Sequence, residues 1–346
     1  GLSKLAADEL KSTLNLSPVA TARIRKREQL WVQTSDPAGL LSLRMPEDVF
    51  VEADRIKLVG QDTDLKALVK LLSRPETLGA AVRVYEHLAG RPLPGRIVFR
   101  VVAQADDVSW RDYRRVDLQT AAQTGIARAY PGWRLNAEEA PIEVWLHQVG
   151  RQLAVSLRLT RALHIARRDR VVEREAALRP TIAAAMVLAS RPGDEDVFLD
   201  PMCGSGTILL ERAQAGRHGL LLGGDIDAAA VRAALANFGP RHKPRRIERM
   251  DARKLPLENA SVDKYVSNLP WGIKINKPED LPVLYAQILA EAVRVVRSGG
   301  ILVLLTSQWD LLKRLVKAQP KLKFDYTVTN IEVMGRRADM FVLHRL

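Results

Sequence analysis

The chain of 346 residues is long enough for two or three domains, and its apolar fraction of 47% excludes global disorder. Its 53 Lys and Arg residues outnumber 40 Asp and Glu residues, and the net charge of +13 is spread over both halves of the chain. Such a spread favours a polyanionic partner, most commonly a phosphate backbone. A single cysteine, Cys203, excludes an internal disulfide and Cys-based zinc sites. The histidines show no metal-binding spacing, so no metal is expected.

No apolar run approaches the roughly 20 residues that a membrane span needs, and no signal peptide is visible. We therefore expect a cytoplasmic protein with no membrane partner.

The first 60 residues combine a helical period with strand-like segments. Apolar residues at positions 2, 5, 6 and 10 suit one face of a helix. Strands are expected over Ala22–Arg27 and Gln29–Thr34, and a further strand within Val49–Val59. This pattern predicts a small α/β fragment over residues 1–60.

Residues 61–165 read as a second, mixed α/β module. Helices are expected over Asp62–Leu72, capped by Asp62 or Thr63, over Glu76–Leu88, which Pro75 would start, and over Asp117–Ala129. Strands are expected over Ile97–Ala103, Ile142–Gln148 and Leu153–Thr160. The basic run Arg161–Arg174 then predicts an interdomain connector, for which a merely solvated linker is the alternative.

From residue 166 onward, short apolar strands alternate with helices. After a helix over Thr181–Ser190, strands are expected over Val197–Asp200, Leu220–Asp225, Ile247–Met250, Tyr265–Asn268 and Ile301–Ser307. Continuous apolar strands between helices predict a buried parallel sheet that is covered on both faces. The last two strands, Phe324–Val333 and Met340–His344, are expected to pair antiparallel at the sheet edge.

A glycine-rich loop, Asp200-Pro201-Met202-Cys203-Gly204-Ser205-Gly206-Thr207, follows the first of these strands. Open α/β sheets bind ligands at this position, and the start of the next helix offers free N–H groups to an anion. The loop is not a phosphate-binding Walker loop, since no Gly-Lys-Ser/Thr follows. It also lacks the third glycine of the dinucleotide fingerprint, where Leu209 stands, and Cys203 excludes a Gly-x-Ser-x-Gly nucleophile elbow.

Acidic residues end the next two strands. Asp225 can accept hydrogen bonds from ribose hydroxyls. Asp227 competes for that role, but its position favours an N-cap of the following helix. Asp251 could bind an adenine amino group. A simple turn or helix cap is the alternative for each acid taken singly, and their repetition at successive strand ends argues for a nucleoside site.

The fourth strand ends in Asn268-Leu269-Pro270-Trp271-Gly272. The Asn268 side chain and the Pro270 carbonyl are two acceptors in one turn, which suits an exocyclic amino group. Trp271 offers a face on which a flat base can stack. The alternative is a tight turn with Trp271 in the core.

These motifs together resemble the S-adenosylmethionine-dependent methyltransferases that modify exocyclic amines. Over nearly its full length the chain is similar to the THUMP-domain tRNA guanine-N2 methyltransferases. The resemblance implies an α/β protein of three parts: a ferredoxin-like domain over 1–60, a THUMP RNA-binding module with linker helices over 61–165, and a Rossmann-like methyltransferase domain over 166–346. The last domain would hold a mostly parallel sheet with an antiparallel last strand.

The resemblance also implies site roles. Asp225 would hold the ribose of S-adenosylmethionine and Asp251 its adenine. The acceptor turn would consist of Asn268, Leu269, Pro270 and Trp271, with Asn268 also beside the cofactor. Many relatives have Pro-Pro-Tyr/Phe after the first position, and Leu269 supplies a backbone carbonyl equally well. The methionine part would be lined by Asp200, Cys203, Gly204, Ser205, Gly206 and Thr207.

The implied activity is transfer of a methyl group to the exocyclic N2 of a tRNA guanosine. The family's THUMP module grips the 3′ end of tRNA, and the acceptor stem would reach the catalytic site of a monomer. Position 6 is preferred, because an N-terminal ferredoxin-like domain and an Asn-Leu-Pro-aromatic turn are present. Position 10 or ribosomal RNA are the alternative targets, and a non-catalytic RNA-binding protein is the alternative from another class.

Overall fold

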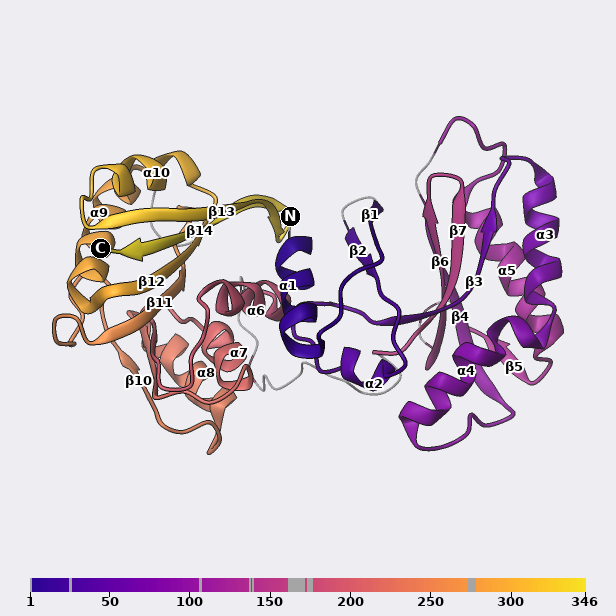
Figure 1. The fold of residues 1–346 in the computed structure, drawn as a ribbon, viewed down its shortest axis with the longest axis horizontal. Helices are drawn as coiled ribbons and strands as arrows, with labels where there is room; N and C mark the ends of the chain where they lie inside the picture. Colours follow the sequence, from indigo (N-terminus) through magenta and orange to yellow (C-terminus); the bar gives the residue numbers. More distant parts are fainter. Residues whose placement is uncertain are drawn as a thin grey trace. The chain divides into compact units, whose positions relative to one another are not determined.

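The computed structural model describes residues 2–24, 27–105, 108–136, 138, 140–160, 172, 177–272 and 278–346 (Figure 1). Two compact units divide the chain: one comprises Gly1–Glu9 and Arg167–Leu346, and the other comprises Leu10–Ala166. The boundary falls inside the first helix, α1 (Ser3–Leu14). Of the basic run 161–174, only Val172 belongs to the described residues. Within the described part of the chain, no helix combines the length and apolarity required to cross a bilayer.

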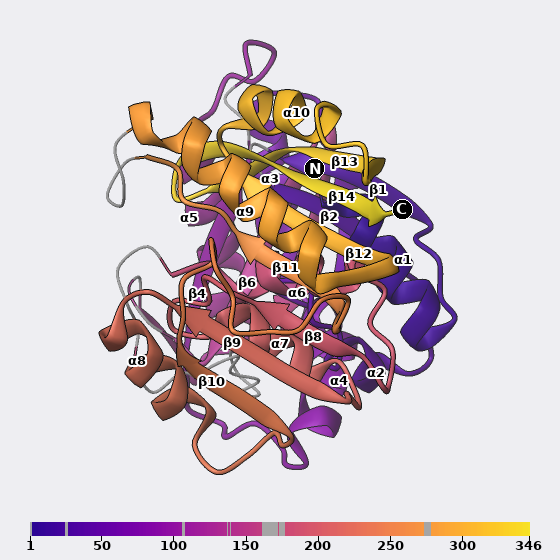
Figure 2. The ribbon, with the colours of Figure 1, turned by 90° about the vertical axis from the view of Figure 1, so that its left-hand side faces the viewer.

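The unit that holds residues 167–346 is built on a seven-stranded sheet with the order β10-β9-β8-β11-β12-β14-β13 (Figure 2). Its strands are β8 (Val197–Asp200), β9 (Leu220–Asp225), β10 (Arg245–Arg249), β11 (Val262–Asn268), β12 (Val296–Thr306), β13 (Leu322–Val333) and β14 (Arg336–Arg345). Strands β8 to β12 run parallel, and β14 is antiparallel to both of its neighbours. The predicted Rossmann-like sheet with an antiparallel final pair is therefore confirmed.

Helices cover both faces of this sheet, with α6 and α7 on one side and α9 and α10 on the other (Figures 1 and 2). The helices are α6 (Pro180–Ala189), α7 (Thr207–Gln214), α8 (Ala228–Phe238), α9 (Leu281–Val295) and α10 (Trp309–Lys317), and a short 3-10 turn (Pro278–Asp280) precedes α9. The apolar runs of the strands supply the core, in which Leu199, Tyr265 and Leu302 are fully buried. Burial of both faces explains why these strands read as continuous apolar segments.

The unit that holds residues 10–166 contains a five-stranded sheet with the order β3-β7-β6-β4-β5. Its strands are β3 (Phe50–Lys57), β4 (Ile97–Gln104), β5 (Trp133–Leu135), β6 (Ile142–Val149) and β7 (Gln152–Arg158). The helices α3 (Asp62–Leu72), α4 (Pro75–Ala89) and α5 (Arg115–Ala129) cover one face of this sheet (Figure 1). Leu68, Leu118 and Val144 are fully buried in the core between the helices and the sheet.

The N-terminal segment differs from the expected separate α/β fragment. Strands β1 (Ala20–Ile24) and β2 (Arg27–Trp31) form a hairpin of their own, followed by the short helix α2 (Pro37–Leu40). Strand β3, which we grouped with residues 1–60, instead pairs antiparallel with β7. Its partner lies about 100 residues further along, a pairing that no local pattern reveals. The three-residue strand β5 was missed because so short a run carries no period.

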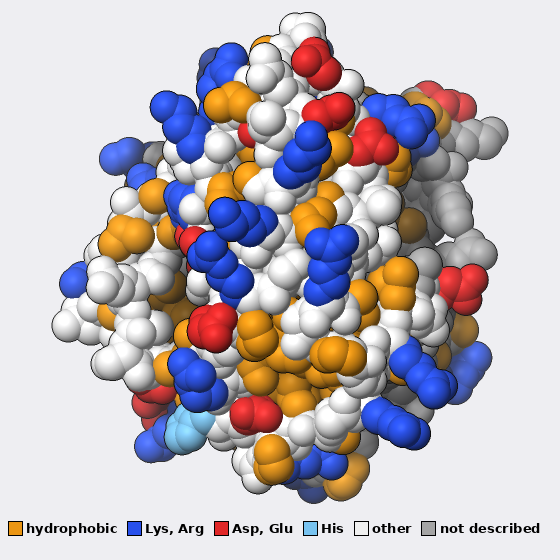
Figure 3. All heavy atoms as spheres, turned by 90° about the vertical axis from the view of Figure 1, so that its right-hand side faces the viewer, with side chains coloured by type: hydrophobic (Ala, Val, Ile, Leu, Met, Phe, Trp, Pro, Cys, Tyr) orange, Lys and Arg blue, Asp and Glu red, His pale blue; other side chains and the backbone are white. Residues whose placement is uncertain are grey.

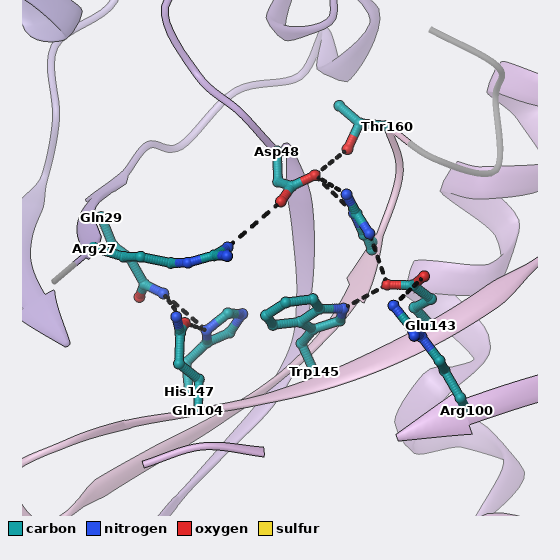
Figure 4. A network of polar contacts seen from close by, with 10 residues as sticks. Arg27, Gln29, Asp48, Arg100, Gln104, Glu143, Trp145, His147 and Thr160 are labelled. Atoms are coloured by element: carbon teal, nitrogen blue, oxygen red, sulfur yellow. Dashed lines mark hydrogen bonds and ion pairs between the residues drawn. The ribbon is translucent and has the colours of Figure 1, made fainter. Parts of the chain in front are cut away.

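A polar network lies inside this unit, between the hairpin and the sheet (Figure 4). Glu143, 1% exposed, lies between two guanidinium groups: Arg100 at 2.8 Å and Arg158 at 2.9 Å. Its Oε2 also accepts a hydrogen bond of 2.9 Å from Trp145 Nε1. Asp48 accepts a second hydrogen bond of Arg158, at 2.7 Å. Each buried carboxylate of this network is thus paired with a cation.

Candidate active site at the carboxyl ends of the strands

The glycine-rich loop leaves β8 and enters α7 with two residues in the left-handed region, Gly204 at φ +55° and Gly206 at φ +82°. A Cβ at Gly206 would meet the Ala234 Cβ at 3.2 Å, whereas a Cβ at Gly204 would meet no atom within 4 Å. The hydrogen bond from Cys203 N to Gly224 O, 2.7 Å long, ties the loop to β9. The backbone at Gly204 therefore borders open space, as a ligand-binding loop requires.

Asp200 ends β8 and is 1% exposed. Its Oδ1 accepts hydrogen bonds from Ser267 Oγ at 2.8 Å and from Met202 N at 3.3 Å. Burial, together with the neighbouring Asp225 carboxylate, raises the pKa of Asp200 to about 7. A cationic group that binds beside this carboxyl would favour its ionised form.

Asp225 and Asp227 have different surroundings in the structure. The two carboxylate oxygens of Asp225 accept hydrogen bonds from Gly204 N and Asp227 N, both at 2.9 Å, so this side chain faces the glycine-rich loop. Asp227 is exposed and caps α8 by accepting from Ala229 N at 2.8 Å. The predicted helix cap at Asp227 is confirmed, and Asp225 is the acid beside the loop.

Asp251 follows β10 and pairs with Arg253, whose Nη2 lies 2.6 Å from Asp251 Oδ2. Hydrogen bonds from the Arg253 guanidinium lower the pKa of Asp251, which stays ionised at neutral pH. The carboxylate is therefore present as an acceptor at this strand end, with Arg253 as its neighbour.

The turn after β11 brings its polar groups together. Asn268 Oδ1 accepts a hydrogen bond of 3.2 Å from Trp271 Nε1. Pro270 O accepts from Tyr285 Oη at 2.7 Å, and among the described residues no donor contacts the Leu269 carbonyl. Leu269 N donates to Leu305 O of β12 at 3.0 Å, which anchors the start of the turn.

The sheet order brings these residues to one edge. Strands β9, β8 and β11 are neighbours and parallel (Figure 2). Their carboxyl ends, Asp225, Asp200 and Asn268, therefore lie at the same edge of the sheet. Cys203 and Ser205 are buried in the loop beside them, and Thr207 begins α7. In the described part of the chain, no group of three or more His, Cys, Asp or Glu side chains could hold a metal ion.

Sequence reasoning missed residues that support the site from outside the motifs. Asn237 of α8, 1% exposed, donates from Nδ2 to Ser205 O at 3.0 Å, and its side chain also exchanges two hydrogen bonds with the backbone of Val172. Tyr285 of α9 reads as a core residue in an apolar helix. Gln308 lies two residues after the carboxyl end of β12, and the argument applied to polar residues at the other strand ends would have singled it out.

Comparison with known proteins identifies the family. Residues 167–337 match the family of RMKL-like methyltransferase domains. The tRNA (guanine(6)-N2)-methyltransferase of Thermus thermophilus is 31% identical over 283 residues, which are 80% of this chain and 81% of that protein. The chain belongs to the family of THUMP-domain tRNA (guanine-N2)-methyltransferases. Members of this family use S-adenosylmethionine as the methyl donor.

Two further matches frame this family membership. The crystal structure of TrmN from Thermus thermophilus superposes with a TM-score of 0.79 and 25% identity, and covers 100% of this chain and 97% of TrmN. The U6 snRNA (guanine-N(2))-methyltransferase THUMPD2 of Mus musculus is 34% identical over 179 residues, 51% of this chain. The chain spans about a third of the length of the THUMPD2 relatives.

The residues at the strand ends fit S-adenosylmethionine. Ser205 Oγ is buried and has no hydrogen-bond partner in the described structure, so it is free to bind a ligand atom. The open space beside Gly204 also lets a ligand approach the backbone there. Asp200 offers a buried carboxyl with no counter-charge among its hydrogen-bond partners, which suits a molecule that carries a sulfonium and an ammonium group.

Proposed function

We propose that this protein transfers a methyl group from S-adenosylmethionine to the exocyclic N2 of a tRNA guanosine, at position 6 in the acceptor stem. The observation that carries the proposal is the juxtaposition of Asn268 with Asp200 and Asp225 at adjacent strand ends. It puts an amide acceptor next to a loop that fits the methyl donor. The likeness of the Thermus thermophilus enzyme over four fifths of both chains supports position 6.

The cofactor would be held by side chains of three strands. Asp225 would bind the ribose hydroxyls with lone pairs not used by Gly204 N and Asp227 N. Asp251 would accept from the adenine amino group. Asp200 and the loop residues Cys203, Gly204, Ser205, Gly206 and Thr207 would line the methionine part. When bound, S-adenosylmethionine supplies an electrophilic methyl group on its sulfonium.

The chain's own contribution is to hold the target nitrogen. The lone pair of an exocyclic amine is delocalised into the ring, which makes the amine a poor nucleophile. Asn268 Oδ1 and the Pro270 carbonyl would accept its two N–H groups and so favour a tetrahedral nitrogen with a localised lone pair. Trp271 would stack on the base once the base has left the helix. An amide does not take the proton, which leaves after transfer, so most of the catalysis is positioning.

For the partner, we infer that residues 10–166 hold the RNA as a THUMP module with the hairpin segment before it, and that they grip the tRNA 3′ end. Figure 3 shows Lys and Arg side chains over the face of this unit that carries its helices. In α3, α4 and α5 or directly before these helices, six basic residues are exposed: Lys66, Lys70, Arg74, Arg83, Arg114 and Arg128. Exposed cations on a folded RNA-binding module suit a phosphate backbone. We propose a monomer that acts on cytoplasmic tRNA.

The test is methylation of defined RNAs by the full-length protein with labelled S-adenosylmethionine. A tRNA with guanosine at position 6 should yield N2-methylguanosine after digestion to nucleosides, and replacing that guanosine by adenosine should abolish incorporation. If the tRNA with adenosine at position 6 is still methylated, and methylation is lost when the guanosine at position 10 is replaced, the target is position 10. If ribosomal RNA or U6 snRNA is labelled and tRNA is not, the substrate is that RNA and not tRNA. Binding of RNA without incorporation into any of these RNAs would favour a non-catalytic protein.

A further inference from the structure

The acceptor turn is held from the protein interior by side chains outside the motif. Tyr285 Oη lies 2.7 Å from Pro270 O and 2.7 Å from Thr306 Oγ1. Thr306 Oγ1 also lies 2.9 Å from Gln308 N, and Gln308 Nε2 donates to Trp271 O at 3.1 Å. Tyr285 and Thr306 are both 0% exposed. The carbonyls of two successive turn residues therefore each receive a donor from α9 or from the end of β12.

The direction of this hydrogen-bond chain follows from what each atom can do. Pro270 O can only accept, so the single phenolic proton of Tyr285 lies on that bond. Gln308 N–H can only donate, so it uses a lone pair of Thr306. The remaining proton of Thr306 then points to the Tyr285 oxygen. Burial raises the pKa of Tyr285 to about 12, so the phenol keeps its proton at neutral pH.

We propose that Tyr285 and Thr306 are positioning residues that fix the Pro270 carbonyl and, through it, the geometry of the acceptor turn. The inference rests on the proposed function of that turn. The phenol takes one lone pair of Pro270 O and so holds the plane of the Pro270–Trp271 peptide, from which the Trp271 side chain starts. Hydrogen bonds that run in one direction strengthen each other, and a buried chain resists exchange with water.

This orientation matters because the turn carries the groups that meet the target base. The start of the turn is tied to β12 through Leu269 N, but its second half ends at Gly272 with φ +74°. A glycine in this region adds no side-chain restraint of its own. Among the described residues, the Tyr285 and Gln308 donors hold the carbonyls of the second half, and their loss would let the Pro270–Trp271 peptide tilt.

The decisive pair of variants is Tyr285→Phe and Tyr265→Phe. Both tyrosines are 0% exposed in the same unit, but the Tyr265 hydroxyl has no hydrogen-bond partner in the described structure. Tyr285→Phe should lower single-turnover methylation about 10- to 100-fold, the size expected from slight misplacement of reacting groups. Its affinity for S-adenosylmethionine should stay within about twofold of wild type, and Tyr265→Phe should keep wild-type turnover.

Thr306 provides the conservative rescue. Thr306→Val has the same shape but neither donates to Tyr285 nor accepts from Gln308 N, so it should also lower the turnover rate. Thr306→Ser keeps the hydroxyl and should retain most of the wild-type rate. It removes the γ-methyl group of Thr306 from the core, so a role in packing alone would make this variant the more damaging one. A residue that acts only through packing would show the opposite order, with Thr306→Val above Thr306→Ser.

A spectroscopic measurement reports on the carbonyl without any catalysis. Pro270–Trp271 is the only Pro-Trp pair in the sequence. Protein labelled with carbon-13 at proline carbonyls and nitrogen-15 in tryptophan therefore gives one carbonyl–nitrogen correlation in a triple-resonance spectrum. Its carbonyl shift should move in Tyr285→Phe and Thr306→Val, and should stay in place in Tyr265→Phe and Thr306→Ser.

The outcomes separate this inference from the proposed function. An active wild type in which Tyr285→Phe keeps full turnover would overturn the positioning role, and so would a carbonyl shift that does not move. A wild type that methylates no RNA would overturn the proposed function. In that case the carbonyl shift still decides whether Tyr285 fixes the turn.

Discussion

The two units of this molecule surround a buried carboxyl group on their sheets with partners of different charge. Glu143, inside residues 10–166, is bonded to Arg158, Trp145 and Arg100. Burial alone would raise its pKa, but these hydrogen bonds lower it below its ordinary value. Asp200, at the strand ends of the other unit, receives only the neutral donors Ser267 and Met202, and its pKa rises to about 7.

This difference indicates which of the two carboxyl groups is suited to bind a cationic ligand. A carboxylate with its cations in place is complete and fixes the fold around it (Figure 4). A buried carboxyl without a counter-charge is stable only if it is protonated or if a cation arrives from outside. S-adenosylmethionine carries such charge, and the unbalanced carboxyl therefore supports the proposal that Asp200 lies in the cofactor site. Four predictions, each with its own variants, are given below in order of decreasing expected effect.

Glu143→Gln should destabilise residues 10–166 by about 3–5 kcal/mol, because it removes the buried anion that two partly buried guanidinium groups share. Chemical denaturation followed by circular dichroism measures the loss. The matched control is Glu52→Gln on β3 of the same sheet, whose partner Arg55 is exposed and whose pairing is worth about 1 kcal/mol at most. Equal effects at the two positions would mean that the buried network contributes no more than a surface ion pair.

Asn268→Ala should lower single-turnover methylation about 10²- to 10³-fold, by analogy with the loss of one preorganised group at a reacting centre. Affinity for S-adenosylmethionine and for tRNA should be unchanged, since the side chain acts on the target nitrogen. Asn268→Asp keeps an acceptor and should retain partial activity. Trp271→Phe should be tolerated better than Trp271→Ala, because a ring remains for stacking. Turnover of Asn268→Ala near that of wild type would return the turn to a purely structural role.

Asp225→Ala should weaken S-adenosylmethionine binding at least tenfold, about 1.4 kcal/mol, because both ribose hydroxyls lose a charged acceptor. Titration calorimetry measures this affinity. Asp227→Ala is the matched control: it removes the cap of α8, at a stability cost of about 1 kcal/mol, and should leave affinity unchanged. If Asp227→Ala weakens binding and Asp225→Ala does not, Asp227 is the residue that binds the ribose.

Much of the unit that holds residues 167–346 was predictable from local patterns. The strands β8 and β9 were predicted to the residue, because an apolar run that ends in Asp marks both the strand and its carboxyl end. Parallel order then brings Asp200 and Asp225 together without further information. The helix cap at Asp227 followed from its offset of two residues from the strand.

What could not be predicted depends on contacts between distant residues. The pairing of β3 with β7 and the bonds of Tyr285 join segments whose own patterns say only strand and buried helix. The pairing of Asp251 with Arg253 was missed although the residues are two positions apart, since charge alone does not fix a side-chain rotamer. The sequence pattern thus predicted which strand ends form the candidate site, and packing determines how their side chains are held.

Asp200→Asn tests the contrast between Asp200 and Glu143 through the pH dependence of the free energy of unfolding. The folded pKa of about 7 exceeds the ordinary value of 3.8, so the folded protein holds this proton more tightly than the unfolded chain. The stability of the wild-type protein without cofactor should therefore fall as pH rises from about 4 to about 7, a loss that is absent in Asp200→Asn. The free energy of unfolding of the variant, measured by urea denaturation, should thus rise relative to wild type between pH 5 and pH 8. In the wild type, saturating S-adenosylmethionine should shrink that gap, since its cationic groups would favour the ionised carboxyl. A difference between the two proteins that stays constant with pH would show that Asp200 is charge-balanced like Glu143, and the contrast between the two units would be wrong.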